Sequence, residues 1–281
     1  MKSYYINICL FLIAIFVFTS CEERIDIKLK DSDKRIVVEG SITTETKAHK
    51  VIITESSSYF YNQVAPVVSG ATVTISDNLG NVFPLTEIPS NSGIYYTDAN
   101  VKGIAGRTYT LKITNVDIDK NGKTEEYTAS DLLKPVLTLD TISFELIDSI
   151  KYPPIYAING WGQEPSTTGD YYVWKYYKNG ILESDTLDEL AFSDDNMVNG
   201  NYLPGFTIFA GAALPGDTIT VETISATKGY FDFIISFMIE TRWNQGGIGG
   251  PPANVKTNIS NGGLGWFNAS DVTIAKGVVP N

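Results

Sequence analysis

The sequence predicts a mainly β protein, in which an immunoglobulin-like antiparallel β-sandwich is followed by a second β-rich domain that carries one buried helix. Two observations predict the sheets: short β-branched runs recur at intervals of roughly ten residues, and clusters of Gly, Asn, Asp and Pro separate them. A third observation predicts the helix, because one apolar segment near residues 229–242 spaces its polar side chains four positions apart.

The first domain is predicted over residues 34–134. One strand candidate alternates Tyr109, Leu111 and Ile113 with polar neighbours, which gives one face to a core and the other to solvent. About seven short strands in about a hundred residues are typical of an antiparallel sandwich. The strand candidates are residues 35–44, 50–56, 70–76, 82–88, 93–98, 106–116 and 125–129.

Pro135 interrupts this rhythm and begins a second predicted domain, which runs to residue 281. One hairpin candidate turns at Asn179-Gly180, a dipeptide that tight β-turns favour. In its first arm Tyr172, Trp174 and Tyr176 share one face. The strand candidates of this domain are residues 137–149, the hairpin 170–186, 217–226 and a short strand near 272–275.

The helix predicted near residues 229–242 is mostly apolar and carries one polar stripe of Asp232, Ser236 and Glu240. A membrane span is excluded, because the apolar run is about 14 residues long and holds two acids, whereas a span needs about 20 apolar residues. The Gly-, Asn- and Pro-rich stretch that follows, residues 243–270, is predicted to be loop.

The N-terminus predicts a lipoprotein signal peptide. Lys2 is the only charge before Glu22, and an apolar run of 15 residues lies between them. The run ends in Phe-Thr-Ser-Cys, which resembles a bacterial lipobox, so residues 1–20 would be removed and Cys21 would be acylated. Residues 21–33 would then be a lipidated tether, held on a lipid bilayer by the acyl chains. The alternative is an ordinary signal peptide with a coincidental cysteine.

Cysteine content and charge exclude several classes of function. Cys9 lies in the segment to be removed and Cys21 would carry lipid, so no thiol remains for a disulfide, a nucleophile or a thiolate metal site. The formal net charge of −11 becomes −12 when Lys2 leaves with the signal peptide. An acidic protein of this kind is not expected to bind nucleic acid, which needs a positive surface.

Several segments together resemble a Bacteroidota lipoprotein family of unknown function, domain family 4249. They are the lipobox, "VVEGSITT", "VSGATVTISDNLGN", "GIYYTD" followed by "GRTYTLKI", "GDTITVETISATKGYFDF" and "PPANVKTNISNGGLGWF". The resemblance covers nearly all of the mature chain in the expected order. It implies a cell-envelope location, an immunoglobulin-like N-terminal half and genetic neighbourhood with TonB-dependent outer-membrane receptors. It implies no activity and no functional residues.

Candidate catalytic residues are few. His49 is the single histidine and lies in a polar link between two strand candidates, so it is predicted to be exposed and inert. The doublets Asp194-Asp195 and Glu125-Glu126 could serve acid and base chemistry, but neighbours on a strand face opposite ways. We therefore expect solvated surface acids and no enzymatic activity.

The best candidate metal ligands are Asp117, Asp119 and Asn121, which with Gly122 match the first half of a calcium loop. The twelfth position of that loop would be Thr128, where a calcium loop has a bidentate Glu. A plain hairpin that turns at Asn121-Gly122 is the favoured interpretation, so no metal and no cofactor are expected.

Trp161 and Trp243 are the candidate ligand-binding residues, because both stand in Gly-rich segments where an indole could meet a sugar or a partner protein. The alternative is that they are part of the core. Trp266 and Phe267 are predicted to pack inside the protein.

The expected function is that of a non-enzymatic outer-membrane lipoprotein, an accessory or ligand-capturing partner of a TonB-dependent uptake system. The alternative is a surface adhesin or polysaccharide-binding structural lipoprotein, and a hydrolase comes third. Glu22 and Glu23 follow the cysteine and resemble a surface-export signal, so exposure on the cell surface is expected. A glycan or peptide ligand is compatible with either function.

Overall fold

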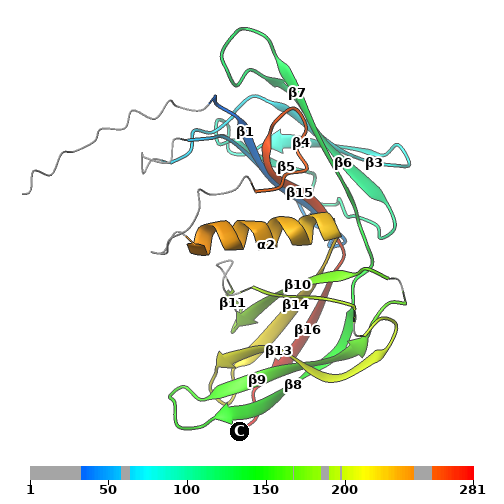
Figure 1. Cartoon of the computed structure of the whole chain (residues 1–281), viewed down its shortest axis with the longest axis vertical. Helices are drawn as coiled ribbons and strands as arrows, with labels where there is room; N and C mark the ends of the chain where they lie inside the picture. Colours follow the sequence, from blue (N-terminus) through cyan, green and yellow to red (C-terminus); the bar gives the residue numbers. More distant parts are fainter. Residues whose placement is uncertain (1–32, 58–63, 167, 185–189, 197, 244–254) are drawn as a thin grey trace, which may run out of the picture. The chain divides into compact units, whose positions relative to one another are not determined.

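The computed structural model describes residues 33–57, 64–166, 168–184, 190–196, 198–243 and 255–281, without the side chains of residues 241–243 (Figure 1). Residues Asp33–Asn281 form one compact unit. The predicted signal peptide, Cys21 and nearly all of the tether lie outside the described residues. The fold is mainly β with one described helix, which confirms the predicted class. The immunoglobulin-like assignment stays a prediction.

Eight strands form the first sheet, in the order β15-β1-β2-β5-β4-β3-β6-β7. Seven of them come from the predicted first domain, and each neighbouring pair among these seven is antiparallel. Their bounds are β1 Ile36–Thr43, β2 Lys50–Glu55, β3 Thr72–Asp77, β4 Val82–Glu87, β5 Ile94–Tyr96, β6 Thr108–Val116 and β7 Glu125–Leu132.

The core of this sheet follows from the alternation of its side chains. Tyr109, Leu111 and Ile113 of β6 are buried, as their spacing predicts. They join Ile36 and Val38 of β1 in one cluster. The path of strands bends back on itself, because Ser260, close to β15, exchanges hydrogen bonds with Thr128 of β7 at the opposite end of the path.

Strand β15 (Leu264–Ser270) corrects the prediction of a loop over residues 243–270. It pairs in parallel with β1, from Val37 opposite Leu264 to Thr43 opposite Ser270. Composition misled here, because Gly265 is needed at a tight approach: a Cβ at this position would lie 2.0 Å from the carbonyl oxygen of Val38. The predicted boundary at Pro135 stays a prediction, but the first sheet uses a strand from beyond it.

Two antiparallel sheets form the rest of the unit. The three-stranded sheet has the order β13-β9-β8, and the larger one has the order β11-β10-β14-β16 with β12 also paired to β10. Their bounds are β8 Thr138–Asp148, β9 Ile155–Gln163, β13 Tyr202–Ala212, β10 Tyr171–Lys178, β11 Ile181–Leu182, β12 Ala191–Asp194, β14 Thr218–Ala226 and β16 Val272–Val278.

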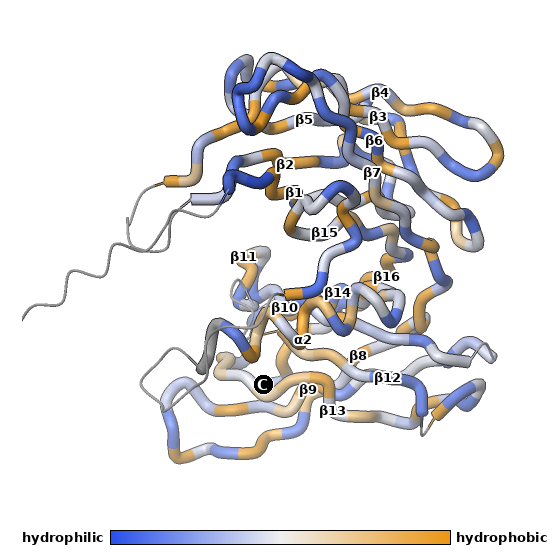
Figure 2. Tube along the Cα trace, turned by 45° about the horizontal axis from the view of Figure 1, so that its top comes forward, coloured by the Kyte–Doolittle hydropathy of each residue, from blue (hydrophilic) through white to orange (hydrophobic). Residues whose placement is uncertain are grey.

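An aromatic core fills the space between these two sheets. Tyr172, Trp174 and Tyr176 of β10 are buried, in line with the face that their spacing predicts. From β13, Phe206 meets the ring of Trp174 at 5.4 Å, and Phe209 meets that of Tyr176 at 5.5 Å. Figure 2 shows hydrophobic segments along β9 and β13, which border this core.

Helix α2 (Lys228–Trp243) agrees with the predicted range and covers the opposite face of the larger sheet. Ile234 and Met238 are buried there, but Phe237 and Ile239 are exposed. The helix is therefore half-buried, whereas the sequence predicts a buried helix. Its Phe233 also packs on Trp266 of β15, with ring centroids 5.3 Å apart. Within the described chain, no helix is both long and apolar enough to cross a membrane.

Candidate functional site

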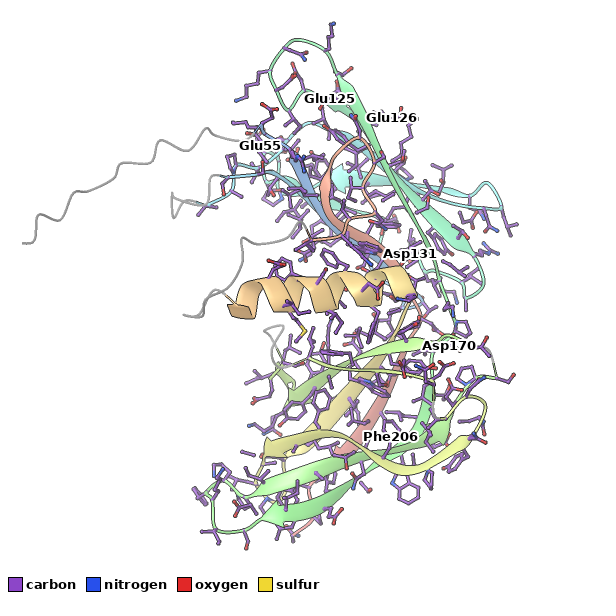
Figure 3. The ribbon with its side chains drawn as sticks, in the orientation of Figure 1. Glu55, Glu125, Glu126, Asp131, Asp170 and Phe206 are labelled. Atoms are coloured by element: carbon purple, nitrogen blue, oxygen red, sulfur yellow. The ribbon has the colours of Figure 1, made fainter. Side chains whose placement is uncertain are left out.

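Three buried carboxylates meet where three strands end or begin. Glu164 directly follows β9, Asp170 directly precedes β10, and Asp195 directly follows β12. Each offers one oxygen, and these oxygens all lie within 4.8 Å of one another. The side chains are 1%, 1% and 3% exposed, respectively. We refer to Glu164, Asp170 and Asp195 as the acidic cluster; Figure 3 labels Asp170.

Local backbone structure brings the cluster together. The N–H of Asp195 donates to the carbonyl oxygen of Asp170 at 3.1 Å, which extends the pairing of β10 with β12 by one residue. The turn that follows returns the chain to Glu164: the N–H of Gly200 donates to Oε2 of Glu164 at 2.6 Å, and the N–H of Glu164 donates to the carbonyl of Asn201 at 3.1 Å.

The polar partners of the cluster are unequal. Lys134 pairs with Oδ1 of Asp170 at 2.8 Å, and the hydroxyl of Tyr172 donates to Oε1 of Glu164 at 2.7 Å. Burial and this hydrogen bond raise the pKa of Tyr172, so its hydroxyl stays protonated as a donor. In contrast, Oδ2 of Asp195 is buried and has no hydrogen-bond partner in the described structure. Such an orphaned acceptor is rare in folded proteins.

Comparison with known families identifies the relatives of the chain. The model of a domain of unknown function, DUF4249, matches residues 22–275. The chain belongs to the DUF4249 family. This confirms the family expected from the sequence, while the Bacteroidota origin and the lipoprotein character stay proposals. No curated protein matches the chain.

The acidic cluster of this DUF4249 chain was not found from the sequence. The prediction that Asp194 and Asp195 are both solvated surface acids is wrong for Asp195, because Asp194 is exposed and Asp195 is buried. The two do face opposite ways, as expected of neighbours at a strand end. The sequence offers only a weak indication of the cluster. Its three residues, Glu164, Asp170 and Asp195, each stand beside a strand terminus, but their spacing along the chain matches no motif.

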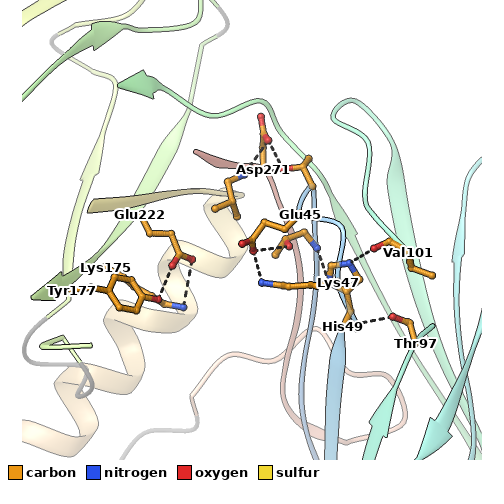
Figure 4. A network of polar contacts seen from close by, with 12 residues as sticks. Glu45, Lys47, His49, Thr97, Val101, Lys175, Tyr177, Glu222 and Asp271 are labelled. Carbon is orange, nitrogen blue, oxygen red and sulfur yellow. Dashed lines mark hydrogen bonds and ion pairs between the residues drawn. The ribbon is translucent and has the colours of Figure 1, made fainter. Parts of the chain in front are cut away.

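His49 is buried, so the prediction of an exposed histidine is wrong (Figure 4). Its Nδ1 accepts a hydrogen bond from the N–H of Thr43 at 3.3 Å, and its Nε2 lies 3.1 Å from the carbonyl oxygen of Val101. Burial lowers the pKa of His49, which favours the neutral ring with its proton on Nε2, donated to Val101. Both ring nitrogens therefore bind backbone, and the residue holds β1 against the loop before β6.

Asp117, Asp119 and Asn121 lie in the loop between β6 and β7, an exposed hairpin connection. Asp117 accepts from the backbone N–H groups of Asn121 and Gly122, at 3.0 and 2.8 Å. Asp119 accepts from the side-chain amide of Asn121 at 2.6 Å. The connection is a hairpin, as favoured, but positive φ occurs at Lys120 and Gly122, whereas a type I′ turn at Asn121-Gly122 would have positive φ at both of those residues. The carboxylates thus accept hydrogen bonds from groups within their own loop.

The structure describes the side chain of only one of the two predicted ligand-binding tryptophans, so it does not bring them together. Trp161 lies on β9, and its Nε1 donates to Oγ of Ser143 at 3.0 Å. A Cβ at Gly205 would lie 2.7 Å from its ring, so β13 covers one part of the indole. Trp243 ends helix α2, and its side chain lies outside the described part of the structure. Phe267 is buried, as predicted, whereas Trp266 is half-buried and packs on Tyr230 of helix α2.

In the second acidic doublet neither residue is buried, and the two side chains have different partners. Glu125 accepts a hydrogen bond from the hydroxyl of Tyr127, and Glu126 pairs with Lys112 at 3.0 Å across the sheet (Figure 3). Glu125 and Asp119 line a cavity of about 570 Å³ beside the start of β1. Lys34 and Arg35 line this cavity together with the acids, so charges of both signs surround it.

Proposed function

We propose that this protein is a non-enzymatic, lipid-anchored protein of the cell envelope that docks on a TonB-dependent receptor as an accessory of uptake. The lipobox-like sequence before Cys21 supports the anchor. The match to the family model begins at Glu22, the residue after this cysteine, which is compatible with a mature chain that begins at Cys21.

The observation that carries the docking proposal is an apolar tip on the hairpin between β8 and β9. Ile150 is 96% exposed and Tyr152 is 85% exposed, while Leu146 and Ile147 are each more than half exposed. These four side chains stand within seven residues of the chain at one end of the hairpin, and contiguous exposed apolar surface marks sites of protein interaction. We refer to Leu146, Ile147, Ile150 and Tyr152 as the apolar tip.

The backbone of the apolar tip is held in a defined shape. Oδ1 of Asp148 accepts hydrogen bonds from the N–H groups of Ile150 and Lys151, at 2.8 and 3.3 Å. An ordered turn loses little conformational entropy on binding. Burying one such aliphatic side chain in a partner contributes about 1.5–3 kcal/mol.

A protein partner fits the apolar tip better than a lipid surface does. Asp148 and Glu145 stand in the same hairpin, beside a single cation, Lys151, and the whole chain is acidic. Membrane-surface segments are rich in Lys and Arg, because the lipid headgroups are anionic. Acyl anchoring in the same membrane raises the effective concentration of the protein at its receptor, so moderate affinity suffices.

Affinity purification of the tagged protein from native membranes in mild detergent tests the proposal. We expect a TonB-dependent receptor, identified by mass spectrometry, to be recovered with the wild type and lost with Ile150→Asp. Leu79→Asp is the matched control, because Leu79 is also an exposed aliphatic residue at a hairpin tip, between β3 and β4. Recovery of the receptor with Ile150→Asp, or its absence from the wild type, would contradict the proposal.

Sugar binding through Trp161, the alternative, has less support. The indole N–H is already bonded to Ser143 and β13 covers part of the ring, whereas sugar-binding platforms leave a ring face open.

A further inference from the structure

We propose that Glu164, Asp170 and Asp195 form a binding site for one divalent metal ion, with Ca²⁺ as the preferred ion. This site is separate from the docking surface and has a structural role: the ion joins the ends of β9, β10 and β12. The site involves neither the lipid anchor nor the receptor.

The spacing of the three oxygens fits a calcium ion. Ca²⁺ binds oxygen at 2.3–2.6 Å, so two ligands on opposite sides of the ion are about 5 Å apart at most. The cluster oxygens lie within 4.8 Å of one another, which allows all three to bind one ion. Mg²⁺ demands near-ideal octahedral geometry and usually keeps several waters, so a site of three buried carboxylates suits Ca²⁺ better.

The charge of the cluster fits a divalent ion. Three carboxylates are buried together, and Lys134 is the cation that pairs with them in the described part of the chain. Two negative charges are therefore left without a cation. Burying unpaired charge is costly, and proteins compensate for it with an opposite charge or with a metal ion. A divalent cation would make the group of four side chains neutral.

The orphaned oxygen of Asp195 is the observation that points most directly to an ion. Its Oδ2 is buried and has no donor, although the residue is held by three backbone hydrogen bonds on its own N–H and carbonyl. A cation would satisfy this acceptor. The two oxygens of Glu164 each accept one hydrogen bond, from Tyr172 and from Gly200, and each retains a second lone pair for a metal.

Tyr172 and Gly200 would not contact a bound metal ion themselves but hydrogen-bond to one of its carboxylate ligands. Groups that hydrogen-bond to a ligating carboxylate fix its orientation before the ion arrives. The competing explanation is that one or two of the carboxylates are protonated and share hydrogen bonds with the others. If that explanation holds, lower pH stabilises the folded protein and calcium does not change its stability.

The test uses the full chain, freed of metal with EDTA and dialysed at pH 7. Isothermal titration with CaCl₂ and thermal unfolding with and without Ca²⁺ are measured on the same protein, with MgCl₂ as the comparison ion. We expect one Ca²⁺ per chain, weaker binding of Mg²⁺ and a higher Tm in Ca²⁺.

Asp195→Asn should abolish the calcium heat and the shift in Tm, and Asp194→Asn should keep both. Asp194 is the matched control, because it is the preceding residue and is exposed. In EDTA, Asp195→Asn should unfold at the same temperature as the wild type or higher, since the variant removes one buried negative charge. A folded variant by circular dichroism thus separates loss of binding from loss of structure.

Several results would overturn the proposal. A wild type that shows neither heat nor a shift in Tm with Ca²⁺ would favour protonated carboxylates. Calcium binding that persists in Asp195→Asn and disappears in Asp117→Asn would place the ion in the loop between β6 and β7. An Asp195→Asn variant that fails to fold is replaced by Glu164→Gln, for which the same loss of calcium response is expected.

Discussion

The hydroxyl of Thr227 donates a hydrogen bond of 2.8 Å to Oδ1 of Asp131, and this contact joins β7 to the residue that directly precedes helix α2. Figure 3 shows Asp131 beside that end of the helix. The other oxygen, Oδ2, accepts from the N–H of Ala269 in β15 at 3.1 Å. Asp131 thus ties together a strand of the first domain, the parallel strand from the C-terminal segment and the helix.

Asp131 should make stability depend on pH. Burial raises the pKa of its carboxyl to about 6 from the ordinary value of 3.8, although the hydrogen bonds act in the opposite direction. Between these values the folded chain keeps a proton that the unfolded chain has lost. Its contribution to stability is therefore full below pH 3.8 and is lost as pH rises through 6, by about 3 kcal/mol in all.

Asp131→Asn tests this directly. Urea unfolding at pH 4, 5, 6 and 7 should show that the free energy of unfolding of the wild type falls relative to that of the variant as pH rises. A difference between the two proteins that stays constant over this range would mean that Asp131 does not titrate as described.

Asp77 should have the opposite effect, at more acid pH. Burial by itself raises its pKa, but hydrogen bonds from Asn81, Arg107 and Leu79 outweigh burial and hold the pKa at about 2. Arg107 lies 2.7 Å from Oδ2 of Asp77. The stability from these contacts is present above pH 3.8 and is lost as pH falls towards 2.

Acid titration of Asp77→Asn checks this second dependence. The wild type should lose stability more steeply than the variant between pH 4 and 2, as followed by circular dichroism. Asp98→Asn is the control, because Asp98 accepts only within its own exposed turn, from Asn100. Equal acid profiles for the wild type and Asp77→Asn would remove the role of the Arg107 pair.

Pairing of β15 with β1 should depend on Gly265. A Cβ there would lie 2.0 Å from the carbonyl oxygen of Val38, and φ is +91°. We expect Gly265→Ala to lower the free energy of unfolding by more than about 3 kcal/mol. Gly262→Ala is the matched control: φ is +72°, but a Cβ would have nothing within 4 Å, so the cost is about 1 kcal/mol. Similar losses in urea for both variants would contradict a tight contact between the strands.

Lys134 should weaken calcium binding while it stabilises the empty cluster. It pairs with Asp170 and also donates to the carbonyl of Gly169 at 2.6 Å. Lys134→Met leaves three carboxylates without a cation, so titration should show tighter binding of Ca²⁺ and a lower Tm in EDTA. Unchanged affinity would mean that the ammonium and the ion do not share the same carboxylates.

Much of the fold could be predicted from local patterns in the sequence. Alternation alone identified the buried face of Tyr109, Leu111 and Ile113, and four-residue spacing identified helix α2 within two residues of its bounds. Both features depend on neighbours in the chain. The depth of burial did not follow from them, because it is decided by what packs on the element.

Features that depend on distant segments were not predicted. Strand β15 pairs with β1 across more than two hundred residues, and its glycines looked like loop. The burial of His49 depends on Val101 and Thr97, which reach it from the connection between β5 and β6 (Figure 4). The acidic cluster needs three loops to converge, and single acids beside strands carry no signal of that meeting.

The proposal that the protein is a lipid-anchored envelope protein is tested most directly by the chemical state of Cys21. The measurement is mass spectrometry of the N-terminal peptide from protein purified from membranes of its native host, with Cys21→Ser as the control. We expect the wild-type chain to begin at Cys21 and to carry acyl chains, and Cys21→Ser to carry none. A wild-type chain that retains residues 1–20, begins elsewhere or bears an unmodified Cys21 would contradict it.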